Sequence, residues 1–156
     1  MGTDNKQLVR QMYEAYGRGD IDAVLKFLTD DFDWYAPGGA PFSGHRLGPQ
    51  QMRQFFSEMQ RWVQIDEFDA DEFLADGDKV VVLGRQRATV RETGQHYETP
   101  WVHVYTLRNG KISAGQAFAD THAVASAFGE STREREALTG PLGVTEPPFS
   151  DEGDRD

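Results

Sequence analysis

The chain has 156 residues, no cysteine and 38% hydrophobic residues, and its 26 acidic and 16 basic side chains give a formal net charge of −10. This length suits one domain, and a chain of this size buries roughly 70% of its unfolded surface. The absence of cysteine excludes disulfides, thiol catalysis and cysteine-ligated metal sites. Net negative charge disfavours nucleic acid and anionic lipid as partners. No apolar run approaches the roughly 20 residues of a membrane span, and the first residues lack a signal-peptide pattern, so we expect a soluble, cytoplasmic protein without membrane contact.

Three helices are predicted in the first part of the chain. Apolar residues at three- and four-residue steps predict a helix over residues 4–16. Asp20 is a suitable N-cap for a second, short helix, and residues 32–35 form a strand candidate. Gly48-Pro49 begins the third helix, with proline at its favoured first position and an apolar face that ends near Val63.

After the third helix, the hydrophobic period changes from about 3.6 residues to about 2, which is typical of strands. Turn signals at residues 76–78, 93–95 and 108–110 separate four strand candidates, near 65–75, 79–92, 96–107 and 111–120. Short turns imply mostly antiparallel pairing. The predicted fold class is α+β: a cone-shaped roll in which three N-terminal helices pack in a curved antiparallel, or mixed, sheet that encloses a conical cavity.

The composition divides the chain into a domain over residues 1–129 and an acidic tail over residues 130–156. The tail carries eight acidic and three basic side chains, and so half of the net charge. Its Gly140-Pro141 and Pro147-Pro148 pairs favour an extended segment, with a possible short helix over 131–138.

Three motifs together resemble the nuclear-transport-factor-2-like (NTF2-like) superfamily, and within it the SnoaL-like and ketosteroid-isomerase-related group. They are YEAYGRGD at 13–20, LTDDFDW at 28–34 and NGKI at 109–112, and the resemblance covers about residues 5–128. It implies an α+β cone and a homodimer formed through the sheet. The chemistry is left open, because this fold carries isomerases, cyclases, dehydratases and non-catalytic binding domains.

The resemblance to ketosteroid isomerases does not extend to their functional residues. Ala36 stands where their carboxylate base is expected, and an ungapped alignment brings Met12, with Tyr13 next to it, to their oxyanion-hole tyrosine. A steroid isomerase proper is therefore disfavoured. The resemblance implies instead that the nearest counterparts of the catalytic histidine and aspartate of SnoaL-like cyclases are His103 and Asp120.

Alternation along the third β candidate places His103 on one face with Tyr97, Thr99, Trp101, Tyr105 and Leu107. An imidazole between aromatic rings can act as an acid–base group, with Asp120 as a base or as the group that orients it. The alternatives are a hydrogen-bonded histidine in the core or at a dimer face, and an aspartate that caps a helix over residues 121–128.

Aromatic side chains suited to a flat organic ligand complete the predicted pocket. They are Tyr13, Tyr16, Trp34, Tyr35, Phe55, Trp101 and Phe118. The four histidines lack metal-site spacing, and neither glycine cluster has the spacing of a nucleotide site, so no metal or cofactor is expected. The leading hypothesis is a small-molecule-binding protein that catalyses proton transfer (isomerisation, cyclisation or dehydration) on an apolar organic substrate. The alternative is a non-catalytic ligand-binding or dimerisation domain.

Overall fold

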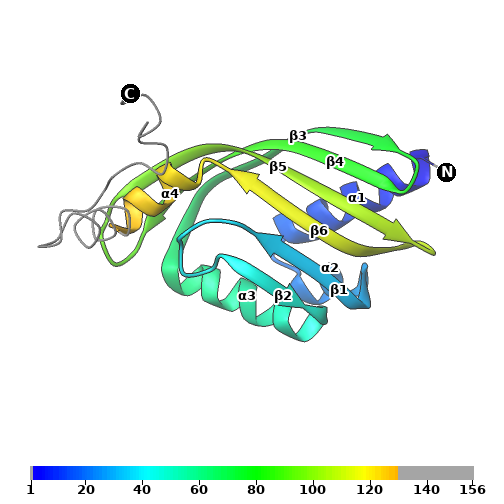
Figure 1. Cartoon of the computed structure of the whole chain (residues 1–156), viewed down its shortest axis with the longest axis horizontal. Coiled ribbons are helices and arrows are strands. Elements are labelled where there is room, and N and C mark those ends of the chain that lie inside the picture. Colours follow the sequence, from blue (N-terminus) through cyan, green and yellow to red (C-terminus); the bar gives the residue numbers. More distant parts are fainter. Residues whose placement is uncertain (1, 130–156) are drawn as a thin grey trace, which may run out of the picture.

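The computed structural model describes residues 2–129, with side chains from residue 4 onward. Within this range, four helices and six strands follow one another along the chain (Figure 1). Their bounds are α1 Gly2–Gly17, α2 Ile21–Lys26, β1 Leu28–Ala36, β2 Gly44–Leu47, α3 Gly48–Trp62, β3 Val63–Asp76, β4 Lys79–Val90, β5 His96–Arg108, β6 Lys111–Ala119 and α4 Thr121–Phe128. The predicted tail over residues 130–156 lies outside the described residues.

The strands form one mixed sheet in the order β2-β1-β6-β5-β4-β3. β1 and β6 pair in parallel, and every other neighbouring pair is antiparallel. Figure 1 shows the sheet curving over α1, α2 and α3, with α4 after the end of β6 and beside the start of β5. The fold class is therefore α+β, as the sequence predicts.

The order of helices and strands differs from the prediction of three helices followed by a sheet. β1, which contains the strand predicted over residues 32–35, and β2, which was not predicted, both lie between α2 and α3, and α4 is the helix given as an alternative over residues 121–128. The sequence analysis missed β2 because its four residues, Gly44–Leu47, show no alternation of apolar and polar side chains. The predicted starts of the second and third helices are confirmed: Asp20 Oδ1 accepts a hydrogen bond from the Ala23 N–H at 3.1 Å, and proline lies in the first turn of α3.

The main core lies between the helices and the inner face of the sheet. Val9 of α1, Phe32 of β1, Val80 and Val82 of β4, and Ile112 of β6 are each at most 1% exposed. They belong to one cluster that also includes side chains from α2, α3 and β5. The helices therefore bury their apolar faces against the sheet, and the pocket described below opens within this layer.

Two glycines let large indole rings lie against the sheet. A Cβ added at Gly84 of β4 would come within 2.2 Å of the Trp101 ring, which belongs to the paired residue on β5. A Cβ at Gly115 of β6 would come within 2.9 Å of Trp34, the paired residue on β1. Any residue other than glycine would place a Cβ in the space that the ring occupies. Glycine at both positions therefore allows the two indoles to lie where they do.

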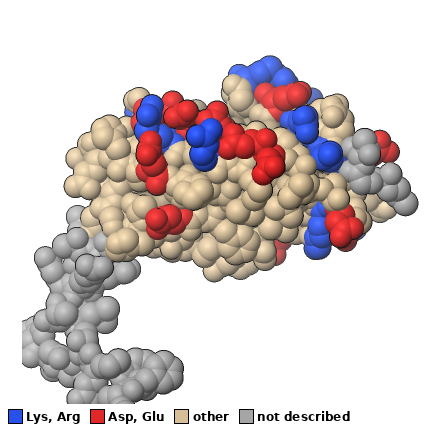
Figure 2. All heavy atoms as spheres, turned by 90° about the horizontal axis from the view of Figure 1, so that it is seen from above, with Lys and Arg blue, Asp and Glu red and all other residues tan. Residues whose placement is uncertain are grey.

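Charged side chains of both signs are intermixed on the face shown in Figure 2. Side chains of opposite charge also form ion pairs between β3 and β4: Arg85 Nε lies 3.1 Å from Asp71 Oδ2, and Arg87 Nη1 lies 3.9 Å from Glu67 Oε2. Exposed pairs of this kind contribute little to stability. None of the helices within residues 2–129 is long and apolar enough to cross a membrane.

Candidate ligand pocket

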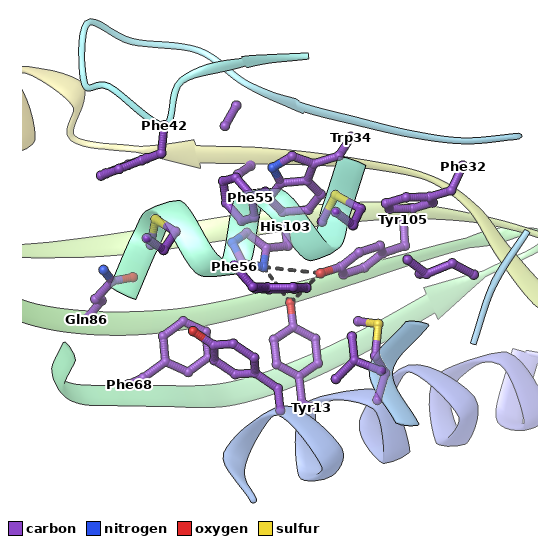
Figure 3. Close-up of a pocket in the computed structure, with 18 of the residues that line it drawn as sticks. Tyr13, Phe32, Trp34, Phe42, Phe55, Phe56, Phe68, Gln86, His103 and Tyr105 are labelled. Carbon is purple, nitrogen blue, oxygen red and sulfur yellow. Dashed lines mark hydrogen bonds between the residues drawn. The ribbon is translucent and has the colours of Figure 1, made fainter. Parts of the chain in front are cut away.

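A cavity of about 160 Å³ lies between the sheet and the helices. Most of its lining is apolar and aromatic, and Figure 3 shows the rings converging on it. The polar side chains among the described lining residues are Tyr13, Tyr16, Gln86, Tyr97, Thr99, His103 and Tyr105, and none of the described lining residues is Asp, Glu, Lys or Arg. The pocket therefore offers hydrogen bonds but no formal charge to a ligand.

His103 on β5 is the centre of a short hydrogen-bonded chain in this pocket (Figure 3). Its Nδ1 lies 2.5 Å from Tyr13 Oη, and Tyr13 Oη lies 2.8 Å from Tyr105 Oη. A consistent assignment of protons has Tyr105 donate to Tyr13 and Tyr13 donate to Nδ1, so that Nε2 carries the imidazole proton. Nε2 has no hydrogen-bond partner among residues 2–129.

Burial controls the protonation of this chain. Desolvation by the surrounding side chains lowers the pKa of His103 to about 3, so its imidazole is uncharged at neutral pH. Burial also raises the pKa of the Tyr13 and Tyr105 hydroxyls, which stay protonated. All three groups are therefore neutral, in keeping with the uncharged lining.

Aromatic rings hold His103 on two sides. Trp101 stacks on the imidazole with ring centroids 4.1 Å apart and planes 24° apart. Trp34 meets it edge to face at 5.3 Å and 84°. Trp101 is in turn stacked on Phe68, at 4.9 Å. This packing fixes the imidazole orientation, and it surrounds the ring with apolar groups.

The structure brings together six of the nine predicted site residues. Tyr13, Tyr16, Trp34, Phe55 and His103 line the pocket, and Trp101 lies against His103 without being part of the lining.

The other three predicted site residues lie elsewhere. The Tyr35 ring lies against His45 of β2, with centroids 4.5 Å apart and planes tilted by 30°, and the residue is absent from the pocket lining. Phe118 is 45% exposed. The exposed Asp120 caps α4, where its Oδ1 accepts a hydrogen bond from the Ala123 N–H at 3.0 Å.

Strand register explains why Asp120 does not meet His103. His103 pairs with Ala117 and Trp101 pairs with Ala119, so the alanines of β6 share the pocket face of β5. Ala117 lines the pocket accordingly. Phe118 is in the opposite phase, so its side chain leaves the sheet on the other side, and Asp120 follows the end of β6 as the N-cap of α4. The expected pairing of His103 with Asp120 is therefore replaced by the pairing of His103 with Tyr13.

The sequence analysis missed several functional candidates in the pocket. Tyr105 lines the pocket together with His103. Its spacing of two residues from His103 predicts the same strand face, and that spacing is the signal that could have identified it. Gln86 of β4 and Phe68 of β3 also line the pocket, and they carried no signal because neither belongs to a motif. Within the described part of the chain, no group of three or more His, Asp or Glu side chains is placed to hold a metal ion.

The curved mixed sheet over three helices, with a pocket between them, is the NTF2-like fold. The SnoaL-like domain family matches residues 9–115, and the chain belongs to this family. An NTF2-like protein from Burkholderia xenovorans LB400 is 30% identical, with a TM-score of 0.76 over 81% of this chain and 97% of that protein. An NTF2-like protein of unknown function from Burkholderia pseudomallei K96243 is also 30% identical, with a TM-score of 0.72 over 80% of this chain and 96% of the other.

A more distant structure, TerC co-crystallised with polyporic acid, shares the fold at 24% identity. Its TM-score is 0.71 over 81% of this chain and 98% of TerC. A comparison with proteins of curated function finds no match.

Proposed function

We propose that this protein binds a small, uncharged organic molecule in the pocket, with a ring against the aromatic lining and a polar group at His103 Nε2. The observation that carries this proposal is the lining itself. It is apolar apart from a few hydroxyl, amide and imidazole groups, and its described residues include no charged side chain. An ionic ligand would lose its hydration there without gaining a countercharge.

The cavity volume supports a ligand, or a part of one, about the size of a single ring. The volume is about 160 Å³. A dry apolar cavity of roughly 150 Å³ in another protein binds benzene. TerC, which shares this fold, has been co-crystallised with a small organic molecule, polyporic acid, and this supports ligand binding as a function for the fold.

His103 supplies the polar end of the proposed site. Its Nδ1 is engaged by Tyr13, while Nε2 is without a partner among residues 2–129 and the residue lines the pocket. Figure 3 shows the two tyrosine hydroxyls gathered at the Nδ1 side of the ring. A ligand carbonyl or hydroxyl at Nε2 would complete the hydrogen bonding of the imidazole.

Three ring compounds of similar shape test this function by isothermal titration calorimetry: acetophenone, α-methylstyrene and benzoate. We expect the two neutral compounds to bind and benzoate to bind at least tenfold more weakly, because burial of a carboxylate is unfavourable. Ala117→Leu fills the pocket and should abolish binding, whereas Ala119→Leu is the matched control on an exposed residue of the same strand. Failure of both neutral compounds to bind, or equal binding of benzoate, would refute the proposal.

Proton transfer at this site is a second candidate function, favoured by the hydrogen-bonded chain of Tyr105, Tyr13 and His103. When Nδ1–H donates to Tyr13, Nε2 has a free lone pair that can take a proton from a carbon next to a carbonyl. The C–H bonding electrons then move to the carbonyl oxygen, and return of a proton to carbon completes the exchange. This is the elementary step of isomerisation and of aldol cyclisation.

Deuterium exchange into the methyl group of acetophenone in D₂O, followed by NMR, measures this step. We expect the protein to accelerate exchange, and His103→Gln to remove the acceleration while the control His122→Gln on α4 keeps it. Because the pKa of His103 is about 3, its imidazole stays uncharged between pH 5 and pH 8. The protein-dependent exchange rate should therefore show no inflection from this group in that range. If exchange is equally fast with and without the protein, proton transfer from acetophenone-like ketones is refuted, and ligand binding is the one proposed function that stands.

A homodimer through the sheet, the arrangement expected from the family resemblance, is also proposed. The outer face of β4–β6 supports it, because neighbouring apolar residues lie there in register: Val81 with Val104, Leu83 with Val102, and Val102 with Phe118. Sedimentation equilibrium should give a dimer for the unmodified chain and a monomer for Phe118→Lys. A monomer in both cases would contradict this arrangement.

A further inference from the structure

Phe42 differs from the other described residues that line the pocket, because it belongs to no helix or strand. It lies in the loop over residues 37–43, which connects β1 to β2. The remaining described lining residues belong to helices or strands, where hydrogen bonds of the backbone resist displacement. Loops move at lower cost than such elements. The loop over 37–43 is therefore the part of the pocket wall that is displaced most easily.

Hydrogen bonds do not tie this loop to the rest of the described chain. Among residues 2–129, the only hydrogen bond made by residues 37–43 runs within the loop, from the Ser43 N–H to the Ala40 carbonyl oxygen at 3.0 Å. The ladder between β1 and β2 ends at the pair of Ala36 and Gly44. The loop can therefore move as a unit without the loss of a ladder hydrogen bond.

Apolar packing against α4 holds the loop in place instead. The Phe42 ring meets Phe128 of α4 edge to face, with centroids 5.8 Å apart, and Figure 3 shows Phe42 at the edge of the group of lining side chains. Phe42 packs against both the main core and a smaller apolar cluster between α4 and the sheet, to which Ala40 also belongs. α4 is fixed to the sheet, because the Asp120 N–H donates a hydrogen bond to Thr99 Oγ1 at 2.8 Å. Phe42 thus closes against a wall that is itself held by hydrogen bonds.

Glycines stand near both ends of the loop. Gly38 has a φ of +128° and Gly44 a φ of +111°, a region of backbone conformation that residues with a Cβ rarely adopt. Glycine reaches a wider range of backbone angles than any other residue. Rotation at these two positions therefore moves Phe42 relative to α4 without strain in β1 or β2.

We propose that residues 37–43 form a gate: Phe42 leaves its place against Phe128 to admit a ligand, and returns to close the pocket over it. This inference rests on the ligand-binding function proposed above and adds to it the route by which the ligand enters. In the structure the gate is closed, so the open form is the minor one. The observed association rate constant is then the value for the open form multiplied by the fraction of molecules that are open.

Phe42→Ala removes the side chain of the gate, and Phe56→Ala is its matched control, because Phe56 is also a partly exposed phenylalanine of the lining but lies within α3. NMR line shapes during titration with acetophenone give the association and dissociation rate constants. We expect Phe42→Ala to raise the association rate constant at least tenfold, because a minor form of this kind makes up at most about a tenth of the molecules. Phe56→Ala removes only a contact with the ligand, so it should raise the dissociation rate constant and leave the association rate constant within twofold.

A second readout uses the unmodified chain without ligand and so does not depend on how well a variant folds. Amide relaxation dispersion should show microsecond-to-millisecond exchange at Gly39 and Phe42 and none along α3. The gate is overturned, while ligand binding stands, if these two amides show no such exchange or if Phe42→Ala leaves the association rate constant within twofold. Failure of the unmodified chain to bind either acetophenone or α-methylstyrene would instead refute the ligand-binding function, and the gate with it.

Discussion

Acidification should destabilise this protein through one side chain, His103. In the folded chain, burial lowers the pKa of its imidazole to about 3, and in the unfolded chain the ordinary value is about 6.5. Between these two values the unfolded chain binds a proton that the folded chain does not. The free energy of unfolding therefore falls as the pH is lowered through this window, with a limiting slope of about 1.4 kcal/mol per pH unit.

The size of the effect follows from the two pKa values. Between pH 7 and pH 5, the protonation of His103 in the unfolded chain removes about 2 kcal/mol from the free energy of unfolding. Asp31 and Asp66 also have lowered pKa values, because hydrogen bonds from Arg108 and from Thr89 stabilise their carboxylates. Their contribution is lost near and below their ordinary pKa of 3.8, so the range above pH 5 separates it from the contribution of His103.

Urea unfolding at pH 5, 6 and 7 measures this dependence. The free energy of unfolding of His103→Gln should change over this range by about 2 kcal/mol less than that of the unmodified chain. His122→Gln, which removes an exposed histidine on α4, should keep the full dependence. NMR of the folded chain at pH 5 should show a neutral His103 ring. An imidazolium at pH 5, or the same pH dependence in His103→Gln as in the unmodified chain, would refute the reasoning.

Two further substitutions test how the site is built. Gly115→Ala places a Cβ 2.9 Å from Trp34 and should lower the free energy of unfolding by about 1–3 kcal/mol. Urea unfolding measures this loss, and calorimetry should show weaker acetophenone binding. An unchanged free energy of unfolding would contradict the packing described. Asp120→Ala removes the cap of α4 and should lower the free energy of unfolding by about 1 kcal/mol, with acetophenone affinity within twofold of the unmodified chain. A much larger loss of affinity would show that Asp120 belongs to the ligand site.

The part of the site that depends on alternation within one strand could be predicted from the sequence. The face of β5 that carries Tyr97, Thr99, His103 and Tyr105 lines the pocket, as its period of two implied. The motifs around the first turn and the last hairpin were sufficient to predict the family. Helix caps such as Asp20 could be predicted from local chemistry.

The parts that depend on pairing between distant segments could not be predicted. The register of β5 on β6 shifts between Thr106 and Leu107, and a slip of one residue exchanges the two faces of a strand. That register decides that Ala117 faces His103 and that Asp120 does not. The contact between Tyr13 and His103 joins residues 90 positions apart, and the sequence carries no local signal for it.

A crystal structure of the protein grown with acetophenone tests the central claim most directly, because it shows whether an uncharged ring occupies the pocket and where its oxygen lies. The account predicts the ring against the aromatic lining, with the carbonyl oxygen next to His103 Nε2. Acetophenone bound only outside the pocket, or bound inside with its oxygen turned away from His103 Nε2, would contradict it.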